Sequence, residues 1–176
     1  MEGLCYGQLD VDLSENHESE FKIISDVYSD LIKSSVIYTS PLKRCMMLAA
    51  WISEGRSYRV EPRIQELNFG KWEGRFWKDI PEEESSSWTQ DFLNTPTPEG
   101  ESYMQMKDRI ILFLNELIDE NPGDAVLVTH AGVIRVLLGY ILEIPPANIF
   151  SLQVDTGRMS SISFENGNFN IEFMNR

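Results

Sequence analysis

The chain has 176 residues, of which 42% are hydrophobic and 11% aromatic, and this composition is typical of a single globular domain rather than of a disordered or fibrous chain. It carries 15 Lys and Arg residues against 28 Asp and Glu residues, and the resulting net charge of −13 argues against nucleic acid or a membrane surface as a partner. No apolar stretch approaches the length of about 18 residues that a membrane-spanning helix needs.

The first part of the chain predicts a loop, a helix and a strand. Residues 1–20 show no sustained hydrophobic period and contain a polar run, which is typical of a loop. Apolar residues then recur at helical spacing and predict a helix from about residue 19 to residue 33. Residues 36–39 are short, β-branched and followed by Ser40-Pro41, so they predict a buried strand that ends in a loop.

The middle of the chain alternates regular and irregular segments. Apolar residues from Cys45 to Ile52 predict a second helix that ends near Gly55, and residues 58–60 predict a short strand. Residues 63–98 are rich in Gly, Trp, Glu and Pro, and we interpret them as an irregular excursion with one helix over residues 82–93.

The last part of the chain predicts a strand between two helices, followed by a hairpin. Apolar spacing predicts a long helix over residues 103–118, and the continuous apolar run 125–129 is typical of a strand covered on both faces. A helix over 133–142 follows directly, which gives a βαβ rhythm. Alternating apolar residues on both sides of Asn166-Gly167 predict a hairpin with a type I′ turn. We therefore expect one α/β domain over residues 1–176.

Two strand-to-helix turns bring together groups that bind anions. His130 follows the strand 125–129 and precedes a helix, where unpaired backbone N–H groups favour an oxyanion such as phosphate. Arg44 lies in the first turn of the helix after strand 36–39, where its guanidinium can hold a phosphate with two hydrogen bonds. A capping histidine and a surface arginine are the ordinary alternatives for each residue alone.

The loop 66–74 carries two carboxylates, Glu66 and Glu73, among aromatic residues and glycines. An apolar surrounding can raise the pKa of a carboxylate into the range that suits a general acid. Solvated surface charge is the alternative for both residues.

These elements, in this order, resemble the histidine phosphatase superfamily, which has the phosphoglycerate mutase-like fold. The matching strings are Tyr38-Thr39-Ser40-Pro41-Leu42-Lys43-Arg44-Cys45, Glu66-Leu67-Asn68-Phe69-Gly70-Lys71-Trp72-Glu73-Gly74, Pro98-Glu99-Gly100-Glu101-Ser102 and Val128-Thr129-His130-Ala131-Gly132-Val133-Ile134-Arg135. The resemblance implies a three-layer α/β/α fold with a mostly parallel sheet. It also implies a phosphomonoesterase that needs no metal or other cofactor and acts on a small-molecule phosphate ester.

The resemblance also implies a role for individual residues. Arg44 would hold the transferring phosphoryl group, His130 would stabilise it by charge and hydrogen bonds, and Ala131 would offer its backbone N–H. Glu66 matches the family's proton donor, and Glu73 is the next carboxylate to consider. The string Gly3-Leu4-Cys5-Tyr6-Gly7-Gln8-Leu9-Asp10 is similar to the opening loop of the α-ribazole phosphatase branch, which implies that Cys5, Tyr6 and Gln8 contact the organic part of α-ribazole 5′-phosphate, a precursor in cobalamin biosynthesis.

The chain departs from the family pattern at its start. Family members begin with a strand that ends in Arg-His, whose histidine is the phosphorylated nucleophile, and this sequence opens at Met1-Glu2-Gly3 without that strand. The other histidine, His17, has no arginine before it and no predicted strand leading into it. We expect a domain shortened at its N-terminus, with the absent strand belonging between those at Val36 and Ala125.

Three alternatives remain open from the sequence. The enzyme could be a general sugar-phosphate phosphatase or a mutase, or this chain could be a non-catalytic module that holds phosphorylated ligands through Arg44 and His130. A cysteine hydrolase would need Cys5 or Cys45 beside His130, whereas the position of Cys45 on an apolar helix stripe favours core packing. Two cysteines are too few for a disulfide scaffold and, with two histidines, they lack zinc-site spacing, so we expect a reduced, cytoplasmic location.

Overall fold

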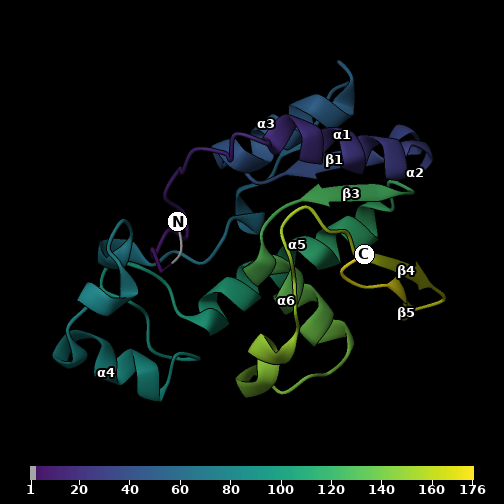
Figure 1. Cartoon of the computed structure of the whole chain (residues 1–176). Helices are drawn as coiled ribbons and strands as arrows, with labels where there is room; N and C mark the ends of the chain where they lie inside the picture. Colours follow the sequence, from purple (N-terminus) through teal and green to yellow (C-terminus); the bar gives the residue numbers. More distant parts are fainter. Residues whose placement is uncertain (1–2) are drawn as a thin grey trace.

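The computed structural model describes residues 3–176, and its helices and strands follow the predicted order (Figure 1). In chain order they are α1 (His17–Val27), α2 (Ser29–Ser34), β1 (Val36–Thr39), α3 (Lys43–Ser53), β2 (Arg59–Val60), α4 (Glu82–Gln90), α5 (Tyr103–Glu120), β3 (Ala125–Val128), α6 (Ala131–Ile141), β4 (Ser161–Glu165) and β5 (Asn168–Phe173). The predicted first helix is the one that differs most: it begins at His17 and is interrupted at Tyr28, which gives α1 and α2.

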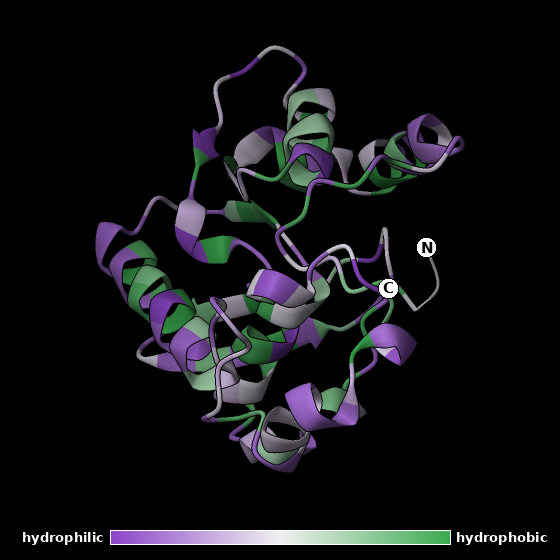
Figure 2. Cartoon of the chain, turned by 90° about the vertical axis from the view of Figure 1, so that its left-hand side faces the viewer, coloured by the Kyte–Doolittle hydropathy of each residue, from purple (hydrophilic) through white to green (hydrophobic). Residues whose placement is uncertain are grey.

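The strands β2, β1 and β3 form a parallel sheet in that order, with helices on both faces. On one face, Ile32 of α2 and the buried side of α3 pack against Ile37, Val126 and Val128. On the other face, α5 and α6 enclose a second core around Tyr38, Ile110 and Val133. Figure 1 shows these layers, and Figure 2 shows hydrophobic stretches in the strands and inner helices with hydrophilic stretches at the periphery. This is the three-layer α/β/α fold with a parallel sheet that the sequence predicts.

The expected position of the absent family strand is wrong. β1 and β3 pair with each other directly, in a register that runs from Val36 opposite Ala125 to Thr39 opposite Val128. β2 occupies the other edge of β1, so no strand fits between β1 and β3. The sheet formed by residues 3–176 therefore has one edge at β2 and the other at β3. Met1 and Glu2, with which the sequence opens, lie outside the described residues.

The hairpin at the C-terminal end has the predicted turn. β4 and β5 are antiparallel, and Asn166 and Gly167 between them have φ angles of 51° and 82°. Two successive residues with positive φ are the signature of a type I′ turn, which matches the twist of the flanking strands. Within residues 3–176 this hairpin forms a two-stranded sheet of its own.

The excursion between β2 and α5 is held together by aromatic side chains. Trp72 is fully buried in a cluster with Cys5 and Ile80, and Trp88 stacks on Trp77 at a ring-centroid distance of 5.8 Å. The N-terminal loop is tied to this cluster by backbone hydrogen bonds, such as Gly74 N to Cys5 O at 2.7 Å. The segment before α1 is thereby placed against the excursion. No helix described for residues 3–176 is long and apolar enough to cross a bilayer.

Candidate active site

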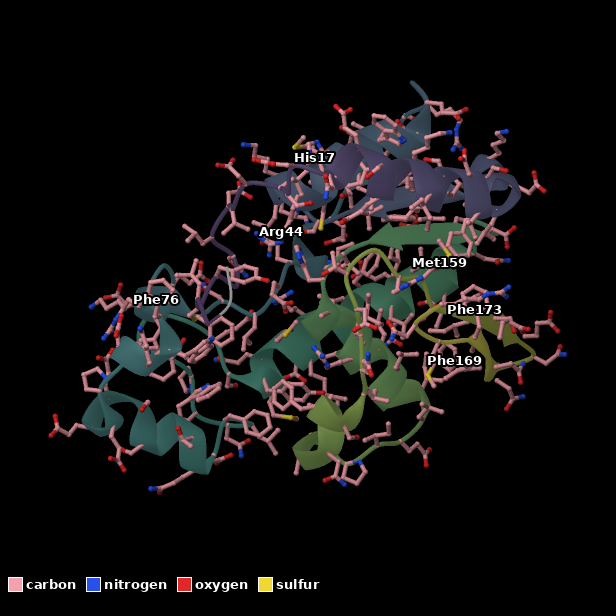
Figure 3. All side chains as sticks on the ribbon, in the orientation of Figure 1. His17, Arg44, Phe76, Met159, Phe169 and Phe173 are labelled. Atoms are coloured by element: carbon pink, nitrogen blue, oxygen red, sulfur yellow. The ribbon has the colours of Figure 1, made fainter. Side chains whose placement is uncertain are left out.

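The candidate site lies where β1 and β3 end. Both strands point their carboxyl ends toward the N-terminal loop and the excursion, and the pairing continues past them through Ser40 N to Val128 O at 2.9 Å (Figure 1). α3 and α6 begin directly after these strand ends. Ligands of parallel α/β sheets bind at this edge, since the loops and helix N-termini that follow the strands converge there. Figure 3 shows Arg44 at this edge, near the middle of the molecule.

His130 makes two polar contacts that define its protonation. Its Nδ1 accepts a hydrogen bond from Nε of Arg44 at 3.2 Å, because a guanidinium N–H can only donate. The hydrogen of the neutral ring is then on Nε2, which donates to Ser40 Oγ at 2.8 Å. The sequence predicted the position of His130 but not Ser40 as its partner, although Ser40 directly follows β1 and is fully buried.

Burial, with smaller contributions from the positive charges of Arg44 and Arg109, lowers the pKa of His130 to about 3. The imidazole is therefore neutral at pH 7 in this structure. Stabilisation of a phosphoryl group by charge on His130 stays a prediction, because an anion beside the ring would raise this pKa. The neutral ring can contribute a hydrogen bond from Nε2–H.

The guanidinium of Arg44 is held by the N-terminal loop as well as by His130. Its Nη2 donates to Gly7 O at 2.6 Å and its Nη1 donates to Leu9 O at 3.0 Å. Together with the contact to His130, these hydrogen bonds use three of the five N–H donors of the guanidinium. One N–H on Nη1 and one on Nη2 remain for an anion.

Glu66 faces the N-terminus of α6. Its Oε2 accepts a hydrogen bond from Gly132 N at 3.1 Å, and its Oε1 accepts one from Leu67 N at 2.9 Å. A methyl group at Gly132 would clash with Glu66 Oε1, so the carboxylate packs directly against the helix backbone. The structure thus brings Glu66 next to the helix that Ala131 opens, and a phosphate at Ala131 N–H would share this N-terminus with the carboxylate.

The substrate-binding residues predicted in the N-terminal loop lie in different surroundings. Cys5 is 1% exposed in the aromatic cluster, so its thiol faces the core and we no longer assign it to substrate binding. Tyr6 is 38% exposed, and its ring centre lies 5.8 Å from the guanidinium carbon of Arg44. Gln8 donates from Nε2 to Glu66 O at 3.0 Å, which places it beside the proposed proton donor.

Glu73 binds backbone N–H groups of the N-terminal loop and of the excursion. Its Oε1 accepts hydrogen bonds from Gln8 N at 2.8 Å and Phe69 N at 3.0 Å. One carboxylate oxygen therefore joins the N-terminal loop to the excursion. Lys43 N donates in a similar way to Asp10 Oδ1 at 2.7 Å, so Asp10 caps the start of α3, a contact that the sequence analysis did not foresee.

The thiol of Cys45 is close to His130 but is poorly suited to nucleophilic attack. Its Sγ lies 3.5 Å from His130 Nε2, within reach of the base that a cysteine hydrolase needs. Burial raises the pKa of Cys45 to about 12 and is the main cause of the low pKa of His130, so neither a thiolate nor an imidazolium is favoured. Cys45 is also 4% exposed and packs between α3 and β3, as the core interpretation predicted.

His17 lies at the start of α1, as Figure 3 shows, and not at the end of a strand. Its Nδ1 is 2.7 Å from Ser14 O, and its ring packs edge-on against Phe21 at 5.5 Å. The side chain of His17 is half-buried. These local contacts give His17 a role in starting α1.

Comparisons with known proteins agree with the fold. The family described as "Histidine phosphatase superfamily (branch 1)" matches residues 1–176. "Putative phosphoserine phosphatase 2" of Hydrogenobacter thermophilus is 24% identical over 179 residues, covering 99% of this chain and 88% of the relative. "Adenosylcobalamin/alpha-ribazole phosphatase" of Salmonella typhimurium is 27% identical over 145 residues, covering 79% of this chain and 72% of the relative.

A solved structure extends the likeness to three dimensions. The mycobacterial glucosyl-3-phosphoglycerate phosphatase in complex with VO3 superposes with a TM-score of 0.82 at 26% identity, covering 98% of this chain and 90% of that chain. The three relatives are thus similar to this chain to about the same degree, and their names give three different substrates.

Proposed function

Since this chain belongs to the histidine phosphatase superfamily, we propose that its pocket binds phosphate monoesters, with Arg44 and His130 as phosphate ligands and Glu66 as the proton donor to the leaving oxygen. The observation that carries the proposal is the Arg44–His130 hydrogen bond of 3.2 Å at the carboxyl end of the sheet, with the Glu66 carboxylate at the adjacent helix N-terminus. Ala131 N–H is the fourth proposed contact. Positioned charge and hydrogen bonds of this kind are what phosphoryl transfer requires of a protein.

We propose α-ribazole 5′-phosphate as the substrate, with the 5′-phosphate at Arg44 and the organic part beside Tyr6. The support is the similarity of the opening loop, the relative named for this activity, and the exposed Tyr6 ring next to Arg44. A planar base would stack on such a ring. General sugar-phosphate hydrolysis and mutase activity are the alternative functions, since neither needs an aromatic contact.

The reaction itself requires a nucleophile that the family pattern places in an Arg-His pair. The two histidines of this sequence are His17 and His130, and neither follows an arginine. A non-catalytic module that binds phosphorylated ligands through Arg44 and His130 is therefore the second proposed function of the chain as it stands. Ligand binding is common to both functions, so binding is the property to measure first.

Calorimetric titration with α-ribazole 5′-phosphate, phosphoserine and ribose 5-phosphate tests the proposal. The Arg44→Ala variant should weaken binding of all three by about 10- to 100-fold, because hydrogen bonds to a charged group contribute about 1.5–3 kcal/mol. Tyr6→Ala should weaken only the α-ribazole ester, by about 2- to 10-fold, since aromatic stacking contributes about 0.5–1.5 kcal/mol.

Phe150→Ala serves as a matched control, since Phe150 is an aromatic residue that is 63% exposed on the turn after α6. Equal affinity of wild type and Arg44→Ala for all three ligands would contradict the phosphate site. Loss of affinity for ribose 5-phosphate in Tyr6→Ala, to the same extent as for the α-ribazole ester, would contradict the aromatic contact.

A further inference from the structure

The guanidinium of Arg109, in the middle of α5, has all five of its N–H donors in hydrogen bonds. Three of them donate to backbone carbonyl oxygens within residues 63–66: Arg63 O at 2.7 Å, Gln65 O at 2.9 Å and Glu66 O at 3.0 Å. The other two donate to the carboxylate of Glu101, at 2.6 Å from Nη2 and 3.0 Å from Nε. A planar fork of five donors can bind several acceptors in fixed directions, which a lysine ammonium cannot do.

Glu101 binds the backbone on the C-terminal side of Glu66. Its Oε1 accepts a hydrogen bond from Asn68 N at 2.9 Å, and its own N–H donates to Asn68 O at 2.9 Å. The backbone is thus held at Arg63 and Gln65 on one side of Glu66 and at Asn68 on the other. The side chains of Arg109 and Glu101 are 20% and 16% exposed, so water competes little for these hydrogen bonds.

The position of Glu66 depends on this backbone. Its carboxylate is within hydrogen-bond distance of Gly132 N, and the packing against Gly132 leaves no space for a methyl group. Gln8 binds the same Glu66 carbonyl that Arg109 binds. A displacement of the segment by a fraction of an ångström would therefore move the carboxylate away from the helix N-terminus.

We infer that Arg109 and Glu101 are positioning residues that hold the carboxylate of Glu66 at the N-terminus of α6. The inference rests on the proposed function, in which Glu66 is the proton donor. Arg109 donates to the backbone of residues 63–66 and Glu101 binds the backbone of Asn68, so both residues act on Glu66 through this segment.

The matched control is a second arginine that ties the same segment to the same helix. Arg63 donates to Glu116 of α5 at 2.6 Å and to Glu61 at 2.8 Å, and its side chain is 29% exposed. It does not hydrogen-bond to Glu66 in this structure. If tying the segment to α5 were the whole role of Arg109, substitution of Arg63 would have the same effect at Glu66 as substitution of Arg109.

The test is an NMR pH titration of the Gly132 amide, which needs no turnover and so remains informative if the proposed reaction fails. In the wild type the Gly132 amide shift should follow the titration of the Glu66 carboxylate, and Glu66→Gln should abolish that transition. In Arg109→Lys most of the amplitude of the Gly132 transition should be lost, whereas in Arg63→Lys it should be retained. Thermal unfolding of each variant shows whether it is folded, and Glu101→Gln replaces Arg109→Lys if the latter does not fold.

Loss of the Gly132 transition in Arg109→Lys or Glu101→Gln, with retention in Arg63→Lys, supports the positioning role. Retention in the Arg109 and Glu101 variants would overturn it. Equal loss in the Arg63 and Arg109 variants would overturn it as well, since the two arginines would then have one shared structural role.

Discussion

His130 is protonated less readily than an exposed histidine because its ring is buried and faces two arginines. Its neutral form accepts from Arg44 and donates to Ser40, so both ring nitrogens have a partner only in that form. Protonation of Nδ1 would place a donor against the Arg44 N–H. The stability of the site is therefore linked to pH.

This linkage predicts a loss of stability in mild acid. The pKa of His130 is lowered from 6.5 to about 3 on folding, so between these values the unfolded chain binds a proton that the folded chain does not. The free energy of unfolding should then fall as the pH falls, by about 1.4 kcal/mol per pH unit. The free energy of unfolding, measured with urea, should fall between pH 7 and pH 5 by about 2 kcal/mol more in the wild type than in His130→Gln. His17→Gln should behave as the wild type, and an equal loss in wild type and His130→Gln would contradict the low pKa.

Glu66 gives a second prediction at this scale, because its carboxylate occupies the helix N-terminus that a phosphate is proposed to use. Glu66→Gln removes one negative charge from the pocket and keeps the shape of the side chain. We expect Glu66→Gln to bind inorganic phosphate more tightly than the wild type, since like charges in a partly buried site repel. Calorimetry at constant ionic strength measures this, with Glu73→Gln as the control. Weaker binding in Glu66→Gln would mean that its carboxylate is not near the phosphate.

The sequence predicted the site residues that follow a strand end, and it missed those that act through the backbone. His130 lies in the turn after β3 and Arg44 in the first turn of the helix after β1, so their meeting at one sheet edge follows from parallel pairing. Ser40, Arg109 and the burial of Cys5 depend on tertiary contacts between segments far apart in the chain. No periodicity within a short window carries that information.

At the scale of elements, the sequence predicted where helices and strands lie in the chain better than it predicted which of them pack together. The strand 36–39 and the hairpin turn were correct because β-branched runs and Asn-Gly specify local geometry. The pairing partner of β1 was wrong, since strand order is a property of the whole sheet. The excursion could not be predicted in detail because its aromatic cluster forms between the N-terminal loop and residues 69–92, which share no local pattern.

The edge formed by β3 leads to a prediction about strand addition. Among residues 3–176, β3 pairs with β1 on one side and with no strand on the other, which leaves backbone donors and acceptors available along Ala125–Val128. A synthetic peptide with a short β-branched run followed by Arg-His-Gly should add at this edge. Binding should raise the thermal unfolding temperature, and a proline within the run should abolish the effect. An unchanged unfolding temperature at saturating peptide would show that this edge does not accept a strand.

At the scale of the whole molecule, the chain is acidic, whereas the candidate phosphate site is built around an arginine. The chain carries a net charge of −13, while the proposed phosphate ligands gather around Arg44, with Arg109 behind the Glu66 segment. An acidic surface repels anions in general, so a phosphate ester must gain its affinity from short-range contacts within the pocket. Long-range steering would weaken with salt, whereas contacts in a partly buried pocket are screened less.

The last prediction concerns turnover by the chain as it stands. Neither histidine lies in an Arg-His pair, and the thiol of Cys45 has a pKa of about 12, so no side chain considered for the pocket is ready to attack phosphorus. We expect purified protein to hydrolyse an aryl phosphate at a rate close to that of the buffer, although it binds the ester.

Robust turnover that is lost in His17→Ala would contradict the contacts assigned to His17 at the start of α1. Turnover that survives in His17→Ala and disappears in Cys45→Ala would show that the buried thiol beside His130 becomes reactive when substrate binds. Peptide-dependent turnover, lost when the histidine of the added Arg-His-Gly is replaced by alanine, would instead show that the pocket of residues 3–176 is competent and lacks only its nucleophile.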